Sequence, residues 1–222
     1  MKKYLYLILI FIISCHKPYE LVSVNLNVSQ VLQLENWGIQ AKNLITIWCP
    51  RIARVLDVEE YPHNIDLTLQ KSDEGIAYAD SNAITVSSHW IEKYPGDIGL
   101  IVHEAVHVVQ LYPEFDPGWV TEGIADYIRW HLYEKKPLEW FPIGEEEKGY
   151  EAAYRITGGF FLWVTNFKNS DFIKILNTAM KNGEYEPDIF FQTTSKDLDP
   201  LWQEYIQFQM ANPQLIPKSS GG

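Results

Sequence analysis

Two histidines and a glutamate share one five-residue stretch, His103-Glu104-Ala105-Val106-His107. A helix turns about 100° per residue, so positions i and i+4 lie on one face about 40° apart. The two imidazoles can therefore reach one metal ion, and Glu104 can take a proton from a water at the open coordination position. Imidazole ligands suit Zn²⁺, which keeps room for water when the protein supplies three ligands. The stretch predicts a zinc site with its own general base.

The surroundings of this stretch argue against a coincidental match. Five-residue matches with three fixed positions arise by chance in on the order of one chain in a hundred. Burying two histidines and a glutamate unpaired would cost several kcal/mol, and a metal ion would supply the missing partner. The predicted helix is apolar nearly all round, with Leu100, Ile101, Val102, Ala105, Val106, Val108 and Val109.

A third metal ligand is expected on the next predicted helix. Glu122 follows His107 by 15 residues, and Asp126 lies one turn further along. We assign Glu122 as the ligand and Asp126 as the acceptor that fixes the tautomer of a ligand imidazole. The reverse, with Asp126 on the metal, stays open, as does an exposed helix carboxylate at 126. Gly123 weakens the helix, which a close approach of the two helices or a need for space around the metal would explain.

The chain resembles the basic secretory protein family, which comprises peptidase-like proteins of plants and bacteria related to the gluzincin metallopeptidases. The resemblance spans roughly residues 60 to 210 and implies a zinc-dependent peptidase. The acidic charge of this chain and its lipoprotein-like start depart from the family pattern without touching the metal site. Two central motifs and two later ones carry the resemblance: HEAVHVVQ (103–110), WVTEGIADYIR (119–129), YRITGGFFLW (154–163) and LDPLWQEY (198–205).

The resemblance also implies a group that stabilises the oxyanion of the reaction. In gluzincins a Tyr or His beyond the third ligand commonly does this, and by its place in the family motif Tyr154 is our candidate. Tyr127 and Tyr150 are rivals, and a core tyrosine bonded to a backbone carbonyl is an equal alternative. In the same enzymes an edge strand beside the metal helix pairs with the substrate backbone, a role open here to residues 76–79 or 83–86.

The resulting hypothesis is hydrolysis of a peptide or protein substrate at a Zn²⁺ ion held by His103, His107 and Glu122, with Glu104 as the catalytic base. One alternative is a non-catalytic surface lipoprotein that binds peptides or glycans and keeps a relic zinc site. Another is a structural zinc site, but such sites prefer four protein ligands. An intact Glu104 argues against both alternatives, since neither has a use for a general base.

Composition and charge limit the partners. The 222 residues carry a net charge of −11 and no run of Lys and Arg. Without a basic patch we expect no nucleic-acid partner. The length suits one domain with a single core, and we expect a monomer.

The N-terminus has the features of an export signal. Lys2 and Lys3 precede the apolar run 4–13, which is too short to span a membrane. The run ends in Ile-Ile-Ser-Cys, which resembles the bacterial lipoprotein processing box, so we expect a signal at 1–14 and a lipid on Cys15. An ordinary signal is the alternative. These features predict an exported bacterial lipoprotein, anchored to a membrane of the cell envelope.

The remaining chain predicts an α+β fold, because strands come first and helices follow. We expect an anchor linker with a first strand at 15–30, one metallopeptidase domain at 31–212 and a disordered tail at 213–222. Helical spacing over 31–56 meets Pro50, which predicts a break or kink near Cys49. Cys49 is expected to be a buried inert thiol. The strand signals predict a small antiparallel or mixed sheet. The strand signals lie at 65–69, 76–79 and 83–86. Helices are expected at 97–111, 119–132, 150–167, 171–180 and 198–210.

Overall fold

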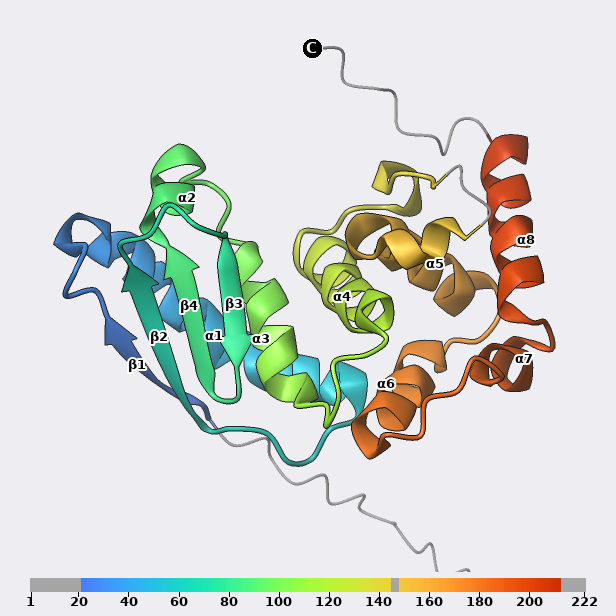
Figure 1. Cartoon of the computed structure of the whole chain (residues 1–222), viewed down its shortest axis with the longest axis horizontal. Coiled ribbons are helices and arrows are strands. Elements are labelled where there is room, and N and C mark those ends of the chain that lie inside the picture. The colour runs from blue at the N-terminus through green and yellow to red at the C-terminus, as the bar shows by residue number, and fades with distance from the viewer. Residues whose placement is uncertain (1–20, 145–147, 213–222) are drawn as a thin grey trace, which may run out of the picture.

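A four-stranded sheet forms one side of the molecule and a group of helices the other (Figure 1). The computed structural model describes residues 21–144 and 148–212. The strand order is β1-β2-β4-β3, which leaves β3 at one edge. The sheet and the helices together confirm the predicted α+β fold. The strands are β1 (Ser23–Asn27), β2 (Asn64–Gln70), β3 (Ala77–Asp80) and β4 (Ala83–Ser87).

The sheet is mixed, which confirms one of the two predicted forms and excludes a purely antiparallel sheet. β1 pairs parallel with β2, and β2 pairs parallel with β4; only β3 and β4 are antiparallel. The helix α1 (Glu35–Leu56) carries the chain from β1 back to the start of β2, which is the crossover that parallel neighbours need. β1 lies inside the segment 15–30, so this part of the expected linker belongs to the sheet.

The first long helix does not break at its proline. α1 runs continuously from Glu35 to Leu56 with Pro50 inside it, although an interior proline costs about 3 kcal/mol. Ile45, Cys49, Ile52 and Ala53 form a fully buried stripe on one face of α1, and their burial offsets that cost. Cys49 belongs to this stripe. Burial raises the pKa of the Cys49 thiol to about 12, as expected of an inert thiol.

The metal-site helix is shorter than predicted. After the short helix α2 (Ser88–Lys93), α3 runs from Leu100 to Gln110. Asp97 does not cap α3; its carboxylate accepts hydrogen bonds from Trp90 Nε1, at 2.9 Å, and from Arg129. Within α3 every residue except His107 is buried. This helix therefore runs through the interior, between the edge strand β3 and the helical side of the molecule (Figure 1).

The helical side begins with α4 (Gly118–Asp126), which continues directly as a π-helical segment from Tyr127 to Tyr133. Short 3₁₀ turns at Leu138–Trp140 and Gly149–Ala152 lead to α5 (Tyr154–Phe167). The expected helices 119–132 and 150–167 are thus each divided into two kinds of helix. The side is completed by α6 (Phe172–Asn182), α7 (Ile189–Thr194) and α8 (Leu198–Ala211), of which α7 was not predicted.

Several expectations lie outside the described residues: the signal at 1–14, lipidation at Cys15 and the tail at 213–222. Among residues 21–144 and 148–212, no helix combines the length and the apolar character that crossing a bilayer requires.

Candidate metal centre

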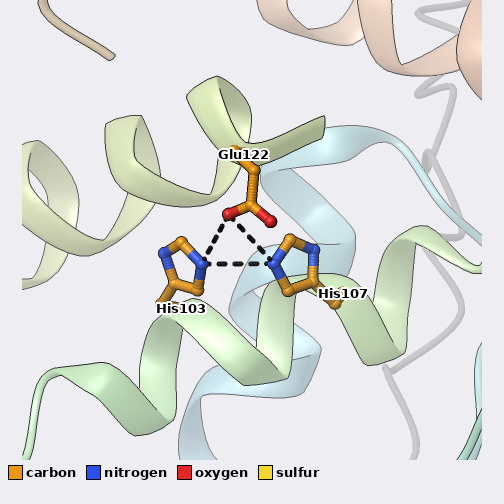
Figure 2. Close-up of side chains that lie close together, drawn as sticks. All are labelled: His103, His107 and Glu122. Atoms are coloured by element: carbon orange, nitrogen blue, oxygen red, sulfur yellow. Dashed lines mark hydrogen bonds and ion pairs between the residues drawn. The ribbon is translucent and has the colours of Figure 1, made fainter. Parts of the chain in front are cut away.

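Two helices bring the three expected ligands together. His103 and His107 project from one face of α3, and Glu122 faces them from α4 (Figure 2). His103 Nε2 lies 3.0 Å from Glu122 Oε2, and His107 Nε2 lies 3.6 Å from the same oxygen. The two Nε2 atoms are 3.2 Å apart. Among the described His, Cys, Asp and Glu residues, these three form a group whose ligand atoms all lie within 4.8 Å of one another.

The opposite nitrogen of each ring has its own acceptor. His103 Nδ1 lies 2.8 Å from Asp126 Oδ1, and His107 Nδ1 lies 2.8 Å from Gln110 Oε1. The amide of Gln110 is oriented by its Nε2, which donates to the carbonyl of Thr121 at 3.3 Å. In a neutral ring these acceptors would hold the proton on Nδ1, which would leave the lone pair of each Nε2 directed at the shared space.

This arrangement fits a metal ion. Two lone pairs from imidazoles and one carboxylate oxygen face the same small space, and three acceptors in mutual contact repel one another unless a cation lies among them. Nitrogen and oxygen donors of this kind suit Zn²⁺ and also other transition metals. Asp126 lies on the Nδ1 side of His103, away from the three converging atoms. The geometry therefore matches Glu122 as the ligand and Asp126 as the acceptor that orients His103.

The pKa shifts of the site groups show the same need for a positive charge. Burial opposes a charge on His103, but its hydrogen bonds to Asp126 and Glu122 outweigh burial and raise the pKa of His103 to about 10. Burial works against the charge of Glu122 as well, but hydrogen bonds from His103 and His107 lower the pKa of Glu122 to about 2. Both shifts favour a positive charge among the three ligands, which is what a bound cation would supply.

Glu104 is a buried carboxyl group beside these ligands, with only 7% of its surface exposed. Burial raises its pKa above the ordinary value, while His103 and His107 act in the opposite direction. Glu104 still faces the cleft described below. A carboxyl group with a raised pKa that lines a cleft is suited to accept and return a proton.

Of the three candidate tyrosines, Tyr154 alone lines the cleft. It begins α5, is 55% exposed, and its ring stacks 6.3 Å from that of His103. Its φ of 48°, after an Ala153 φ of 58°, holds the backbone where non-glycine residues are strained. Tyr127 is buried, and the Tyr150 hydroxyl donates to Asp199 at 2.5 Å. Tyr127 and Tyr150 are therefore structural tyrosines of the core.

A cleft of 1060 Å³ runs over the site. One wall is the edge strand β3 with residue Ile76 before it, and the floor is the face of α3 that carries the two histidines. Sequence reasoning missed two parts of this site: Gln110, which supports His107, and the aromatic residues at the ends of the cleft. Gln110 could have been found from its spacing, because position i+3 from His107 lies on the same helix face.

Fold and site together define an α+β protein in which a His-Glu-X-X-His helix and a carboxylate from the next helix form a metal-type centre under a cleft. The chain matches the family model described as "Peptidase of plants and bacteria", the basic secretory protein family, over residues 53–205. The chain belongs to this family. No match was found among curated proteins or among solved structures.

Proposed function

We propose that this protein is a zinc-dependent peptidase, with the ion held by His103, His107 and Glu122. The observation that carries the proposal is that the three ligand atoms lie within 4.8 Å of one another. In addition, the Nδ1 atom of each imidazole has its own acceptor, Asp126 for His103 and Gln110 for His107. Membership of a peptidase family supports the reaction class. When bound, such an ion would supply Lewis-acid chemistry that acidifies water and polarises a carbonyl group.

The residues of the chain supply the proton transfers and the orientation. Glu104 would take the proton of the attacking water and later deliver it to the leaving amine. Tyr154, beside His103 at the rim of the cleft, would donate a hydrogen bond to the developing oxyanion. Asp126 and Gln110 would keep both imidazoles in one tautomer.

The free edge of β3 supports a polypeptide as the substrate. β3 pairs with β4 on one side, and its other side faces the cleft beside α3. An extended peptide laid along this edge could form backbone hydrogen bonds with it, as added strands do elsewhere. Such binding gives affinity independent of the side chains, so selectivity must come from the other surfaces of the cleft.

A non-catalytic relic is the competing function, and Glu104 argues against it. Keeping a carboxyl group 93% buried is unfavourable. A protein that only binds peptides or glycans gains nothing from that position.

The test is the replacement Glu104→Gln in the zinc-loaded protein. The amide keeps the shape but cannot accept the proton, so hydrolysis of a casein or peptide-library substrate should fall by at least about 100-fold. Zinc content, measured by elemental analysis, should remain one ion per chain. Glu59→Gln, which changes an exposed glutamate, is the matched control and should keep full activity. Full activity in Glu104→Gln would refute the assignment.

We also propose that the protein is exported as a lipoprotein and anchored to the membrane through Cys15. The support is the sequence itself: a short basic start, an apolar run and a Cys-containing processing box. Expression in a bacterial host with a radiolabelled fatty acid should label the chain, and Cys15→Ser should remove the label. Labelling that survives Cys15→Ser would contradict this proposal.

A further inference from the structure

The face of α3 that forms the floor of the cleft has a regular order of residues. Leu100, His103, Glu104, His107 and Gln110 follow one another at helical spacing along this face, Leu111 comes just after its end, and all six line the cleft. The metal ligands therefore lie in the middle of the floor, and apolar side chains lie at both ends. At 1.5 Å per residue the floor is about 16 Å long.

The first end of the cleft is aromatic. Trp90 and Tyr94 lie there with their rings 4.3 Å apart. Trp90 Nε1 donates a hydrogen bond to the carboxylate of Asp97, just before α3. Trp130 completes this end, with the guanidinium of Arg129 4.1 Å above its ring. Arg129 forms salt bridges with Asp97 and Glu134, so these two carboxylates already balance its charge.

The second end is also apolar. Leu111 and Phe115 are exposed large side chains that follow α3, and both line the cleft. The ring of Phe115 lies 6.4 Å from that of His107, so this end begins directly beside the metal ligands. Across the cleft, Ile76 and Tyr78 of the β3 side are exposed as well.

Exposed large apolar residues are costly unless they meet a partner, and here they gather in one place. Six of the exposed large hydrophobic side chains among the described residues line this cleft: Ile76, Tyr78, Tyr94, Leu111, Phe115 and Tyr154. Such a gathering marks a binding surface. Because it extends to both sides of the metal ligands, it offers contacts on both sides of a bond held at the centre.

From this order we propose that the cleft selects an internal, extended polypeptide segment with large apolar or aromatic residues on both sides of the cleaved bond. An extended chain covers about 3.3 Å per residue, so a floor of about 16 Å accommodates about five residues. A site in the middle of such a floor cuts within the chain, which makes the protein an endopeptidase. The inference rests on the proposed peptidase function and specifies its substrate.

The test compares peptides of about ten residues, blocked by acetyl and amide groups, with Phe and Leu or with Ser and Asp around the central bond. For the zinc-loaded full chain, kcat/KM should be at least about tenfold higher for the apolar series, the scale at which an apolar pocket discriminates. Peptides with free ends should be cut at the same internal bonds. Equal rates for the two series, or a need for a free terminus, would overturn the inference.

Two variants locate the selectivity. Tyr94→Ala and Phe115→Ala should each lower kcat/KM several-fold for peptides with an aromatic residue on one side, the two variants affecting opposite sides of the bond. The Ser and Asp series should change little. Phe191→Ala removes an equally exposed ring from α7, outside the cleft, and should have no effect. If both cleft variants match this control, the inference is wrong.

Binding to the Glu104→Gln protein separates this inference from the function on which it rests. Fluorescence anisotropy with the same peptides should give at least about tenfold tighter binding for the apolar series. Preferential binding without hydrolysis by the native protein would retain the cleft assignment and refute the peptidase. Hydrolysis without apolar preference in binding or rate would retain the peptidase and refute the cleft assignment.

Discussion

Each imidazole of the metal centre is fixed at both of its ring nitrogens. Nε2 faces the ligand space, and Nδ1 faces Asp126 in one ring and Gln110 in the other. The first acceptor is a carboxylate and the second a neutral amide, so the two ligands differ in basicity. A carboxylate partner makes its imidazole the more electron-rich ligand. His103 should therefore be the stronger of the two.

Asp126 gives the first prediction at this scale. Asp126→Ala leaves the Nδ1 proton of His103 without an acceptor, so the ring can move its proton to Nε2 and lose the lone pair that binds metal. Zinc affinity, measured by competition with a chelating dye, should fall about 10- to 100-fold. Asp126→Asn keeps an acceptor oxygen and should lose less. Asp188→Ala, at an exposed aspartate, is the control; an unchanged affinity in Asp126→Ala would contradict this role.

The residues of the centre differ in how far the sequence predicts them. His103, Glu104 and His107 are predictable because helical spacing alone brings them together, and Glu122 follows from its place on the next helix. The spacing of Gln110 places it on the helix face of His107, but its role as an acceptor depends on the position of its amide between His107 and Thr121. The backbone of Tyr154 could not be predicted either, because its positive φ depends on the turn that precedes α5.

Among the elements, the packing of α4 on α5 decides where Glu122 lies. Gly123 follows the ligand directly, and a Cβ atom there would meet Thr157 Cγ2 at 2.3 Å and Phe161 Cε2 at 2.9 Å. The close approach expected at Gly123 is thus real, but its partner is α5 and not the metal helix α3. The absent side chain lets α4 lie against α5 with Glu122 turned to the ligand histidines.

Gly123→Ala should therefore destabilise the protein although alanine favours a helix by about 1 kcal/mol. Overpacking against Thr157 and Phe161 should cost about 1–3 kcal/mol net in the free energy of unfolding, measured by urea denaturation. Zinc affinity should fall as well, because α4 must move with Glu122. Gly96→Ala adds a methyl group where no atom lies within 4 Å and should leave both quantities unchanged. A stabilised Gly123→Ala protein would disprove the packing argument.

In the sheet, the sequence predicts which segments are strands better than it predicts how these strands pair. The alternating patterns of β2, β3 and β4 are local and can be recognised in the sequence. Their pairing is not local. β1 and β2 are parallel because α1 returns the chain before β2 begins, and β2 and β4 are parallel because β3 runs back at the edge before β4 enters between them. In the same way, the continuity of α1 at Pro50 is decided by burial on the surrounding core, which local propensity does not contain.

At the scale of the whole molecule, the sheet side and the helical side share one core. A single cluster of buried apolar residues runs from Val22 to Ile206. The metal centre lies where the two sides meet, since α3 packs on α1 and β3 while α4 packs on α5. The geometry of the ligands therefore depends on how firmly the two sides are joined, and a buried asparagine takes part in that junction.

Asn177 of α6 connects both sides through its amide. Its Nδ2 donates to the carbonyl of Leu56 at the end of α1, at 2.9 Å, and its Oδ1 accepts from the Tyr112 hydroxyl after α3, at 2.8 Å. Asn177→Ala removes both hydrogen bonds at once, one of them buried, and should lower the free energy of unfolding by about 2 kcal/mol. Urea unfolding should remain a single transition that coincides by fluorescence and circular dichroism, because the core is continuous. Asn43→Ala, at an exposed site on α1, should change little. Two separate transitions in the native protein would show instead that the sheet side and the helical side fold independently, and that the metal centre joins two units.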